Sequence, residues 1–308
     1  MAALRYFFSL LMVPISLIAA GFSLIAYMAG QTNPNESIFI TFIGLAMPVI
    51  LTINLLILIY WIIKKKWWII IPIAAILLNS GYLASIFQVT ISSSKLPDGK
   101  IPIRIASYNA GKFKSWEHFE TQYYISEFLK NDKANIICFQ EYRENTKINA
   151  DTLSRLLNCP HHAIAYLPGS TTLGTGIFSK YPILQFGKIP LASQTNDAMW
   201  VDIQTGETRI RIISCHLQTT NFSKKRRLLD DPVLQNADIQ QVEDVVTDIS
   251  QELAQNFKIR ATQAQIVRQV IDTTRIPTIV CGDFNDTPSS YTYQYIKGDL
   301  KDSFKTRG

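Results

Sequence analysis

The chain has 308 residues, of which 47% are hydrophobic and 18% charged, and its formal net charge is +6. This length is enough for one sizeable domain plus further elements. Residues 1–94 carry four Lys and Arg residues against one Glu, a charge of +3, and the remaining 26 basic and 23 acidic residues also give +3. The larger part is therefore only mildly basic. That is a weak argument for a nucleic-acid partner, since such proteins usually have a pronounced basic face.

Three long stretches without charge fill the first third of the sequence. Charges are absent between Arg5 and Glu36, and again over residues 37–63 and 67–94. Each stretch exceeds the roughly 20 residues that a helix needs to cross a bilayer. One such stretch is also typical of a buried core helix or a signal peptide, but three in succession favour a membrane anchor. We predict an anchor over residues 1–94, with transmembrane helices at about 6–28, 37–63 and 67–91.

The positive charges predict the orientation of this anchor. Arg5 precedes the first stretch, and Lys64, Lys65 and Lys66 separate the second from the third, whereas the loop at 30–36 has no Lys or Arg. The positive-inside rule puts the N-terminus and the lysines in the cytoplasm. We therefore expect an integral protein of the inner or plasma membrane whose C-terminal domain is periplasmic or extracellular. The lipid bilayer is its expected partner, and no obligate protein partner is inferred.

Residues 95–308 alternate irregularly between strand and helix patterns. Apolar runs of strand length are followed by turn residues, and longer stretches have apolar residues at helical spacing. The order favours an α+β fold or an α/β sandwich of mixed sheets over a regularly alternating doubly wound sheet. The expected strands are 101–108, 135–139, 163–166, 175–179, 183–189, 198–203, 208–215 and 276–280, and the expected helices are 116–130, 148–157, 238–257, 259–273 and 288–296.

Three of the four cysteines end apolar runs. Cys138, Cys215 and Cys281 follow Ile-Ile, Ile-Ser and Ile-Val, which is typical of small buried core residues. A disulfide in an oxidising compartment is left open by the spacing. A Cys/His metal site is not indicated, because the sequence has no Cys-x-x-Cys or His-x-x-x-His pattern.

Polar residues follow four of the predicted strands. They are Asn109, Glu141, His216 and the pair Asp283 and Asn285. Residues i and i+2 of an extended segment point the same way, so this pair is expected to leave the sheet edge side by side. The alternative for the pair is a plain Asp-x-Asn turn. If the four strand ends meet, carboxylate and amide oxygens would suit Mg²⁺ or Mn²⁺, and a histidine would suit a phosphate oxyanion or proton transfer.

Five short segments in order resemble successive motifs of the endonuclease/exonuclease/phosphatase superfamily. They are Tyr-Asn at 108–109, Cys-Phe-Gln-Glu at 138–141, Gly-Ile-Phe-Ser-Lys-Tyr-Pro at 176–182, Ser-Cys-His-Leu at 214–217 and Gly-Asp-Phe-Asn at 282–285. The resemblance covers the chain from about residue 101 to the end. It implies a four-layer α/β sandwich, two mixed sheets flanked by helices, and Mg²⁺-dependent cleavage of phosphoester bonds by water.

The resemblance also implies roles for the strand-end residues. Glu141 matches the principal metal ligand, and Asn109 matches its neighbour in the metal shell. His216 matches the residue that contacts the scissile phosphate. Asp283 matches the residue that orients or deprotonates the attacking water, and Asn285 matches a hydrogen-bond donor to phosphate or water.

Arg260 resembles a helix-start residue of some members that binds substrate, and a surface salt bridge is the equally supported alternative. The basic run at 224–227 is a candidate phosphate contact, although a solvated charged loop is the better interpretation. Members carry two further motifs after Gly-Asp-x-Asn, one with an Asp in a strand and one a terminal Ser-Asp-His. Neither is found before Gly308. We therefore expect the sequence to be a fragment, with loss of half the site as the alternative, and expect little activity from the chain as given.

The leading hypothesis is a membrane-anchored, Mg²⁺- or Mn²⁺-dependent phosphoesterase whose domain faces away from the cytoplasm. Its substrate would be a phosphodiester or phosphomonoester, drawn from extracellular nucleic acid, a phospholipid head group or a small phosphate ester. The competing hypothesis is a non-catalytic, membrane-anchored binding module of the same fold, because a fold does not by itself determine a function. The three apolar stretches contain no charge, so an anchor is favoured over a transport pathway.

Overall fold

The computed structural model describes residues 2–88, 102–114, 121–220 and 239–307. The chain forms two compact units that are not contiguous in sequence. We call the first the helical unit; it comprises Met1–Ser93, Leu253–Ala264 and Asp286–Gly308. We call the second the sheet unit; it comprises Ser94–Glu252 and Gln265–Asn285.

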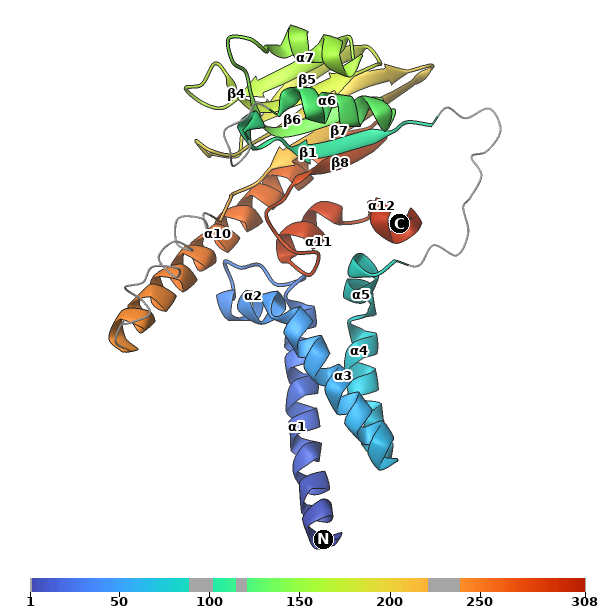
Figure 1. Cartoon of the computed structure of the whole chain (residues 1–308), viewed down its shortest axis with the longest axis vertical. Helices are drawn as coiled ribbons and strands as arrows, with labels where there is room; N and C mark the ends of the chain where they lie inside the picture. Colours follow the sequence, from blue (N-terminus) through green and yellow to red (C-terminus); the bar gives the residue numbers. More distant parts are fainter. Residues whose placement is uncertain (1, 89–101, 115–120, 221–238, 308) are drawn as a thin grey trace. The chain divides into compact units, whose positions relative to one another are not determined.

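Two four-stranded mixed sheets make up the sheet unit (Figure 1). Strand β1 pairs with β2 in parallel, and so does β7 with β8. The other neighbouring strands pair antiparallel. The first sheet has the order β1 (Ile105–Asn109), β2 (Ile136–Arg143), β4 (Leu173–Ser179), β3 (His161–Tyr166). The second has the order β5 (Ile183–Ile189), β6 (Asp197–Thr205), β7 (Thr208–His216), β8 (Thr278–Asp283). The predicted pair of mixed sheets flanked by helices is confirmed.

Strand β2 is buried on both faces, which explains its unbroken apolar run. Ile137 and Phe139 pack against the helices α6 (Gln122–Asn131) and α7 (Ala150–Leu157). The alternate residues of β2 pack between the two sheets, where Cys138 meets the inner face of the second sheet. Successive residues of a strand point to opposite faces. Every second side chain of β2 therefore enters the layer beneath the helices, and the others enter the layer between the sheets.

The cysteines behave largely as expected. Cys138 and Cys215 are fully buried, whereas Cys281 is only partly buried. All four cysteines are free thiols. The structure therefore has no disulfide among them.

A buried carboxylate ties β6 to β7. Asp202 is fully buried; its Oδ1 accepts a hydrogen bond from Arg211 Nε at 2.7 Å, and its Oδ2 accepts one from Arg209 Nη2 at 2.5 Å. The Arg211 guanidinium also stacks on the ring of Trp200 at 3.9 Å. Desolvation acts to raise the pKa of Asp202, but the hydrogen bonds and charges of the two arginines together lower it.

Several element boundaries differ from the sequence expectation. The predicted helices 238–257 and 259–273 form one helix, α10 (Ile239–Thr273), because no Pro or Gly lies between them. The predicted strand 276–280 starts and ends later, at Thr278 and Asp283. The helix predicted at 288–296 is α11 (Tyr291–Lys297), because the Ser290 side chain caps it by accepting a hydrogen bond from Tyr293 N. The starts of the strand at 101 and of the helices at 116 and 238 lie outside the described residues.

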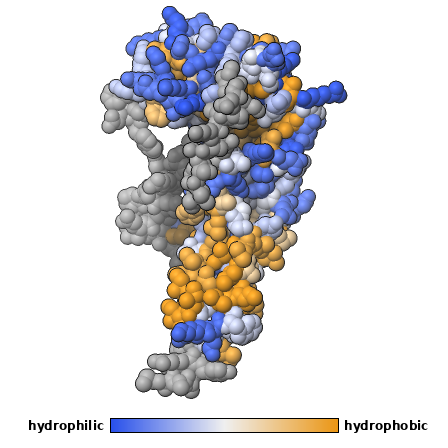
Figure 2. All heavy atoms as spheres, turned by 90° about the vertical axis from the view of Figure 1, so that its right-hand side faces the viewer, coloured by the Kyte–Doolittle hydropathy of each residue, from blue (hydrophilic) through white to orange (hydrophobic). Residues whose placement is uncertain are grey.

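Short and long helices make up the N-terminal part of the helical unit. They are α1 (Ala2–Met28), α2 (Ile38–Leu45), α3 (Met47–Lys64), η1 (Trp67–Ile69), α4 (Ile70–Leu78) and α5 (Ser80–Ile86). Among the described residues, Ser9–Met28 and Met47–Lys64 are long and apolar enough to cross a membrane. Figure 2 shows the broad apolar surface of this part of the chain. Its exposed side chains include Leu10, Ile18, Leu56, Ile63 and Leu77.

The expected second and third membrane segments are both interrupted. The segment predicted at 37–63 is divided at Ala46, two residues before Pro48, whose ring has no N–H to continue the preceding helix. The segment predicted at 67–91 is divided at Asn79, where α4 and α5 meet at 58°. Residues 89–91 lie outside the described part of the chain. The bent α4–α5 pair makes a third candidate span only if the two helices cross as one.

Buried polar side chains join these apolar helices. Trp61 Nε1 donates to Ser16 Oγ at 2.9 Å, which links α3 to α1. Asn54 Nδ2 donates to Ser23 Oγ at 3.0 Å, and Asn79 Nδ2 donates to the Ser23 carbonyl at 3.3 Å. Such bonds are typical of helix association in apolar surroundings, where polar groups otherwise lack partners.

We expect Asp202→Asn to lower the free energy of unfolding by about 3 kcal/mol, because it leaves the partly buried Arg211 without its counter-charge. The pKa of Asp202 is lower in the folded state, so its contribution is present above the ordinary aspartate pKa of about 3.9 and disappears as the pH falls through the folded value. Urea titrations of the detergent-solubilised protein at neutral and acidic pH measure this.

The matched control for Asp202 is Asp272→Asn. The Asp272 side chain is 55% exposed and pairs with Arg268 one helical turn away. Its loss should change the free energy of unfolding by at most about 0.5 kcal/mol. Equal losses for the two variants, or an Asp202 loss that does not change with pH, would contradict the prediction.

Candidate functional site at the strand ends

Four of the predicted strand-end residues come together in the sheet unit. Asn109 Nδ2 donates to Asp283 Oδ2 at 2.9 Å and to Glu141 Oε1 at 3.3 Å. One amide thus bridges two carboxylates that come from different sheets. His216 Nε2 lies 3.8 Å from Glu141 Oε1. The residues of β1, β2, β7 and β8 therefore form one continuous polar cluster.

An irregularity at the end of β2 presents Glu141 to this cluster. The β2–β4 register shifts between Phe139 and Tyr142, and Glu141 has a left-handed φ of 47°. A bulge of this kind redirects a side chain that the regular pleat would bury. The preceding residue, Gln140, is buried and donates from Nε2 to Ser214 Oγ of β7 at 2.9 Å. That bond fastens the end of β2 to the second sheet and so fixes Glu141 near His216.

The prediction that Asp283 and Asn285 leave the sheet side by side is wrong. Asn285 has a left-handed φ of 51°, and its backbone N–H donates to Asp283 Oδ1 at 3.0 Å. This is the Asp-x-Asn turn that the alternative predicted. The Asn285 side chain turns away and donates to the Leu217 carbonyl at 3.0 Å. Asn285 therefore holds the loop that follows His216, while Asp283 faces Asn109.

Gly282 allows β8 to approach β7 at this point. Its φ is +140°, and an added Cβ would lie 2.0 Å from the Cys215 carbonyl oxygen. Only glycine fits both the dihedral angle and the contact. This close approach accompanies the parallel register of β7 and β8, in which Asp283 lies opposite His216.

Arg260 is not part of the cluster of strand-end residues. It belongs to the helical unit, where Nε lies 3.2 Å from Asp286 Oδ2 and the guanidinium stacks on Phe257 at 4.8 Å. Both partners of this ion pair are almost fully buried, with side-chain exposures of 2% and 3%. The pair is therefore a buried salt bridge rather than a surface one. The basic run at 224–227 lies outside the described residues.

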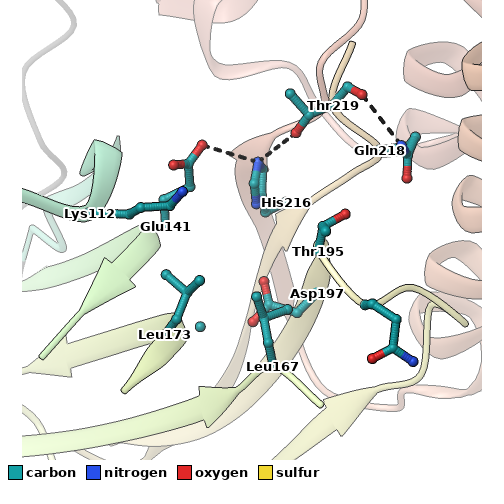
Figure 3. Close-up of a pocket in the computed structure, with 11 residues that line it drawn as sticks. Lys112, Glu141, Leu167, Leu173, Thr195, Asp197, His216, Gln218 and Thr219 are labelled. Atoms are coloured by element: carbon teal, nitrogen blue, oxygen red, sulfur yellow. Dashed lines mark hydrogen bonds and ion pairs between the residues drawn. The ribbon is translucent and has the colours of Figure 1, made fainter. Parts of the chain in front are cut away.

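A cavity of about 250 Å³ lies beside Glu141 and His216 (Figure 3). Two residues there were missed by the sequence analysis, Lys112 on the short turn after β1 and Asp197 at the start of β6. The cavity is lined by Lys112, Glu141, Leu167, Leu173, Gly174, Gln194, Thr195, Asp197, His216, Gln218 and Thr219.

The Asp197 carboxylate is held in a largely buried position. Burial raises its pKa above the ordinary aspartate value, and the hydrogen bond from Thr175 and the neighbouring His216 oppose this effect. The sequence contains a pattern that places Asp197 beside His216. The Thr-Gly-Glu-Thr segment at 205–208 is a hairpin turn, and counting back from Thr205 opposite Thr208 puts Asp197 opposite His216.

The donor set fits a hard divalent cation in part. Mg²⁺ usually takes one or two carboxylates and keeps several waters, and Glu141, with 27% of its side chain exposed, offers such a ligand. Asn109 directs its Nδ2 at the carboxylates, while its Oδ1 accepts from Gly111 N at 3.0 Å. Its amide would have to turn to present oxygen to a metal. In the described part of the chain, no group of three or more His, Cys, Asp or Glu residues is arranged to hold a metal ion.

We expect Gly282→Ala to be destabilising and to displace Asp283, because the new methyl group would meet the backbone of Cys215. The control is Gly206→Ala, where φ is +61° but nothing lies within 4 Å of the added Cβ. That control should cost about 1 kcal/mol from the dihedral angle alone. Thermal unfolding of the two variants compares them, and a Gly282→Ala protein as stable as the control would show that the close approach is not a constraint.

Two family models match the chain. The family model described as endonuclease/exonuclease/phosphatase family matches residues 106–307, and one described as a domain of unknown function, DUF8431, matches residues 7–86. A search of curated proteins finds no match.

Solved structures that resemble the chain include a toxin, a catalytic domain and a sphingomyelinase. A beta toxin from Staphylococcus aureus is 16% identical, with 65% of this chain and 71% of that chain covered and a TM-score of 0.43. The human Nocturnin catalytic domain is 18% identical, with 65% and 69% covered and a TM-score of 0.43. Sphingomyelinase C from Streptomyces griseocarneus is 16% identical, with 65% and 70% covered and a TM-score of 0.40. Because the family model spans well over half of the sequence, this chain belongs to the endonuclease/exonuclease/phosphatase family.

Proposed function

We propose that this protein is a membrane-anchored, divalent-metal-dependent phosphoesterase whose domain faces away from the cytoplasm. The observation that carries the proposal is the amide of Asn109 bridging Glu141 and Asp283, with His216 beside Glu141. Carboxylates brought this close repel each other unless hydrogen-bond donors or a cation offset their charge. Such a cluster beside an open cavity is suited to binding Mg²⁺ or Mn²⁺ and a phosphate ester.

Each residue of the cluster has a separate role in the proposed reaction. Glu141, with Asn109 after rotation of its amide, would hold the metal, which when bound would supply positive charge next to the phosphate. Asp283 accepts hydrogen bonds on both carboxylate oxygens, from Asn109 and from Asn285 N, so its orientation toward an attacking water is fixed. His216 presents Nε2 to Glu141 and would donate to a phosphate oxygen or the leaving group. As water adds to phosphorus, the P–O bond to the ester oxygen breaks. Asp283 would accept the proton of the water, and His216 would supply one to the leaving oxygen.

The proposed location depends on the number of spans. Two crossings would return the chain to the side of its N-terminus, whereas three would carry residues after 88 across the membrane. We therefore propose that α4 and α5 cross as one bent span, with Lys64, Lys65 and Lys66 on the cytoplasmic side. The expected substrates are phosphodiesters or phosphomonoesters on the outer side, from nucleic acid, phospholipid head groups or small molecules.

We expect the native full-length protein in detergent to hydrolyse bis(p-nitrophenyl) phosphate only when Mg²⁺ or Mn²⁺ is present. Glu141→Gln should abolish the rise in melting temperature that Mg²⁺ causes by binding the folded state. His216→Ala should lower kcat by about 100-fold or more and leave that rise intact, because it removes a proton-transfer group and no ligand. DNA cleavage and sphingomyelin hydrolysis measured in parallel separate the substrate classes.

The control for these variants is Glu207→Gln, an exposed acid in the β6–β7 turn, which should match the wild type in both measurements. Metal-independent turnover, or an unchanged Mg²⁺ response in Glu141→Gln, would overturn the assignment. A protein that binds Mg²⁺ through Glu141 but hydrolyses none of these substrates would favour the non-catalytic binding module.

Reporter fusions measure the proposed topology. An exported phosphatase reporter joined after Lys95 should be active, and the same reporter joined after Lys66 should be inactive, because only the first would reach the outer side. A green fluorescent reporter at the two positions should give the opposite pattern. An inactive phosphatase and a fluorescent reporter at both positions would show that α4 and α5 do not cross, because both junctions would then lie in the cytoplasm.

A further inference from the structure

We propose that Asp197 is a positioning residue that holds the His216 ring with Nε2 directed into the cavity. This inference rests on the proposed function for its catalytic consequence. Its structural core, a carboxylate that orients a neighbouring imidazole, is independent of which phosphate ester is cleaved. No role for Asp197 follows from the strand-end motifs, in which the site residues lie after strands rather than at the start of one.

The hairpin of β6 and β7 makes Asp197 and His216 direct neighbours. The two residues are paired in the antiparallel register, nineteen positions apart in sequence. Opposed residues of an antiparallel pair point to the same face, with Cβ atoms about 5 Å apart. Both side chains line the same cavity, and Figure 3 shows Asp197 on the side of the His216 ring away from Thr219.

Asp197 has one oxygen in use and one free of hydrogen bonds. Its Oδ1 accepts from Thr175 Oγ at 2.8 Å, across the gap between the two sheets, and the Thr175 side chain is fully buried. Its Oδ2 is buried without a hydrogen-bond partner. A buried carboxylate oxygen without a donor is costly, and each such group in a folded protein requires an explanation. A donor supplied by the adjacent imidazole provides one.

The contacts of the His216 ring are at Nε2, on the opposite side from Nδ1. The side chain is 5% exposed, and Nε2 lies 3.3 Å from Thr219 Oγ1 and 3.8 Å from Glu141 Oε1 on the cavity side. An imidazole works at a defined atom only when its other nitrogen is held by a hydrogen bond, which sets the tautomer and the ring plane. A small side-chain rotation would bring Nδ1–H of His216 and Oδ2 of Asp197 together. The pair would then keep Nε2 directed at Glu141 and at a bound phosphate.

The test compares Asp197→Asn with the wild-type protein by two measurements. Asn keeps the acceptor for Thr175 and removes the charge. We expect kcat to fall by about 10- to 100-fold with little change in KM, as for other partners that orient a functional histidine. We also expect the ¹⁵N resonances of the His216 ring, assigned with His216→Gln, to change tautomer populations. The Mg²⁺-dependent rise in melting temperature should persist, because Glu141 and Asn109 are untouched.

A matched control is available on the same domain. Asp151 Oδ1 lies 3.7 Å from His162 Nε2, and neither residue lines the cavity. Asp151→Asn also removes a carboxylate next to a histidine, so it should leave kcat and the His216 resonances unchanged. Thr175→Val is the second variant if Asp197→Asn does not fold. It frees Oδ1 of Asp197 and should shift the same His216 resonances.

The outcomes separate this inference from the proposed function. His216 resonances that respond to Asp197→Asn in a protein without phosphoesterase activity would support the pairing and refute the enzyme. An active protein whose kcat and His216 resonances are the same in Asp197→Asn as in the wild type would refute the pairing and leave the enzyme standing.

Discussion

The double burial of β2 is the constraint on which the sheet unit depends. Ile137 and Phe139 fill the layer beneath α6 and α7, and Ile136 and Cys138 fill the layer between the sheets. A strand with apolar side chains on both faces has no place for a polar group except at its end. The bulge at the end of β2 is therefore where Glu141 can leave the core. The same reasoning places His216 at the last position of β7, so a fully packed sandwich concentrates its polar chemistry at one edge.

Hydrogen bonds between the sheets hold that edge in register. Gln140 binds Ser214, Asn109 binds Asp283, and Thr175 binds Asp197. In each pair one residue comes from the first sheet and the other from the second. Face-to-face packing of apolar side chains alone tolerates sliding, whereas directed bonds between buried polar groups do not. The positions of Glu141 and His216 relative to each other follow from these cross-sheet bonds.

In the helical unit, polar side chains join helices whose surfaces are otherwise apolar. Ser23 receives hydrogen bonds from both Asn54 and Asn79, and it is the point where α1 meets α3 and α4. Asn79 also ends α4, so the residue that binds α1 is the one at which the predicted third segment bends. A polar residue in the middle of an apolar run can thus serve as a helix contact and a helix break together.

Much of the fold and part of the site could be predicted from sequence because they depend on local patterns. Apolar runs and turn residues indicated nearly every strand, and the short motifs at their ends identified Asn109, Glu141, His216 and Asp283, which the structure brings into one cluster. The merger of two predicted helices into α10 was missed because a helix end needs a breaking residue, and none lies near Lys258.

The tertiary structure decided what depends on pairing between distant segments. Asn285 was expected beside Asp283, but its left-handed turn and its bond to Leu217 direct it to the loop after β7. Arg260 was a candidate for substrate binding or for a salt bridge, and within the helical unit it pairs with Asp286 and stacks on Phe257. Asp197 lies opposite His216 through the β6–β7 register, which the turn at 205–208 indicates only once the two strands are known to pair. The sequence by itself determined which side chains end each strand. Which of them face one another depended on register and cross-sheet hydrogen bonds, since these are set by packing across the whole domain rather than by neighbours in the chain.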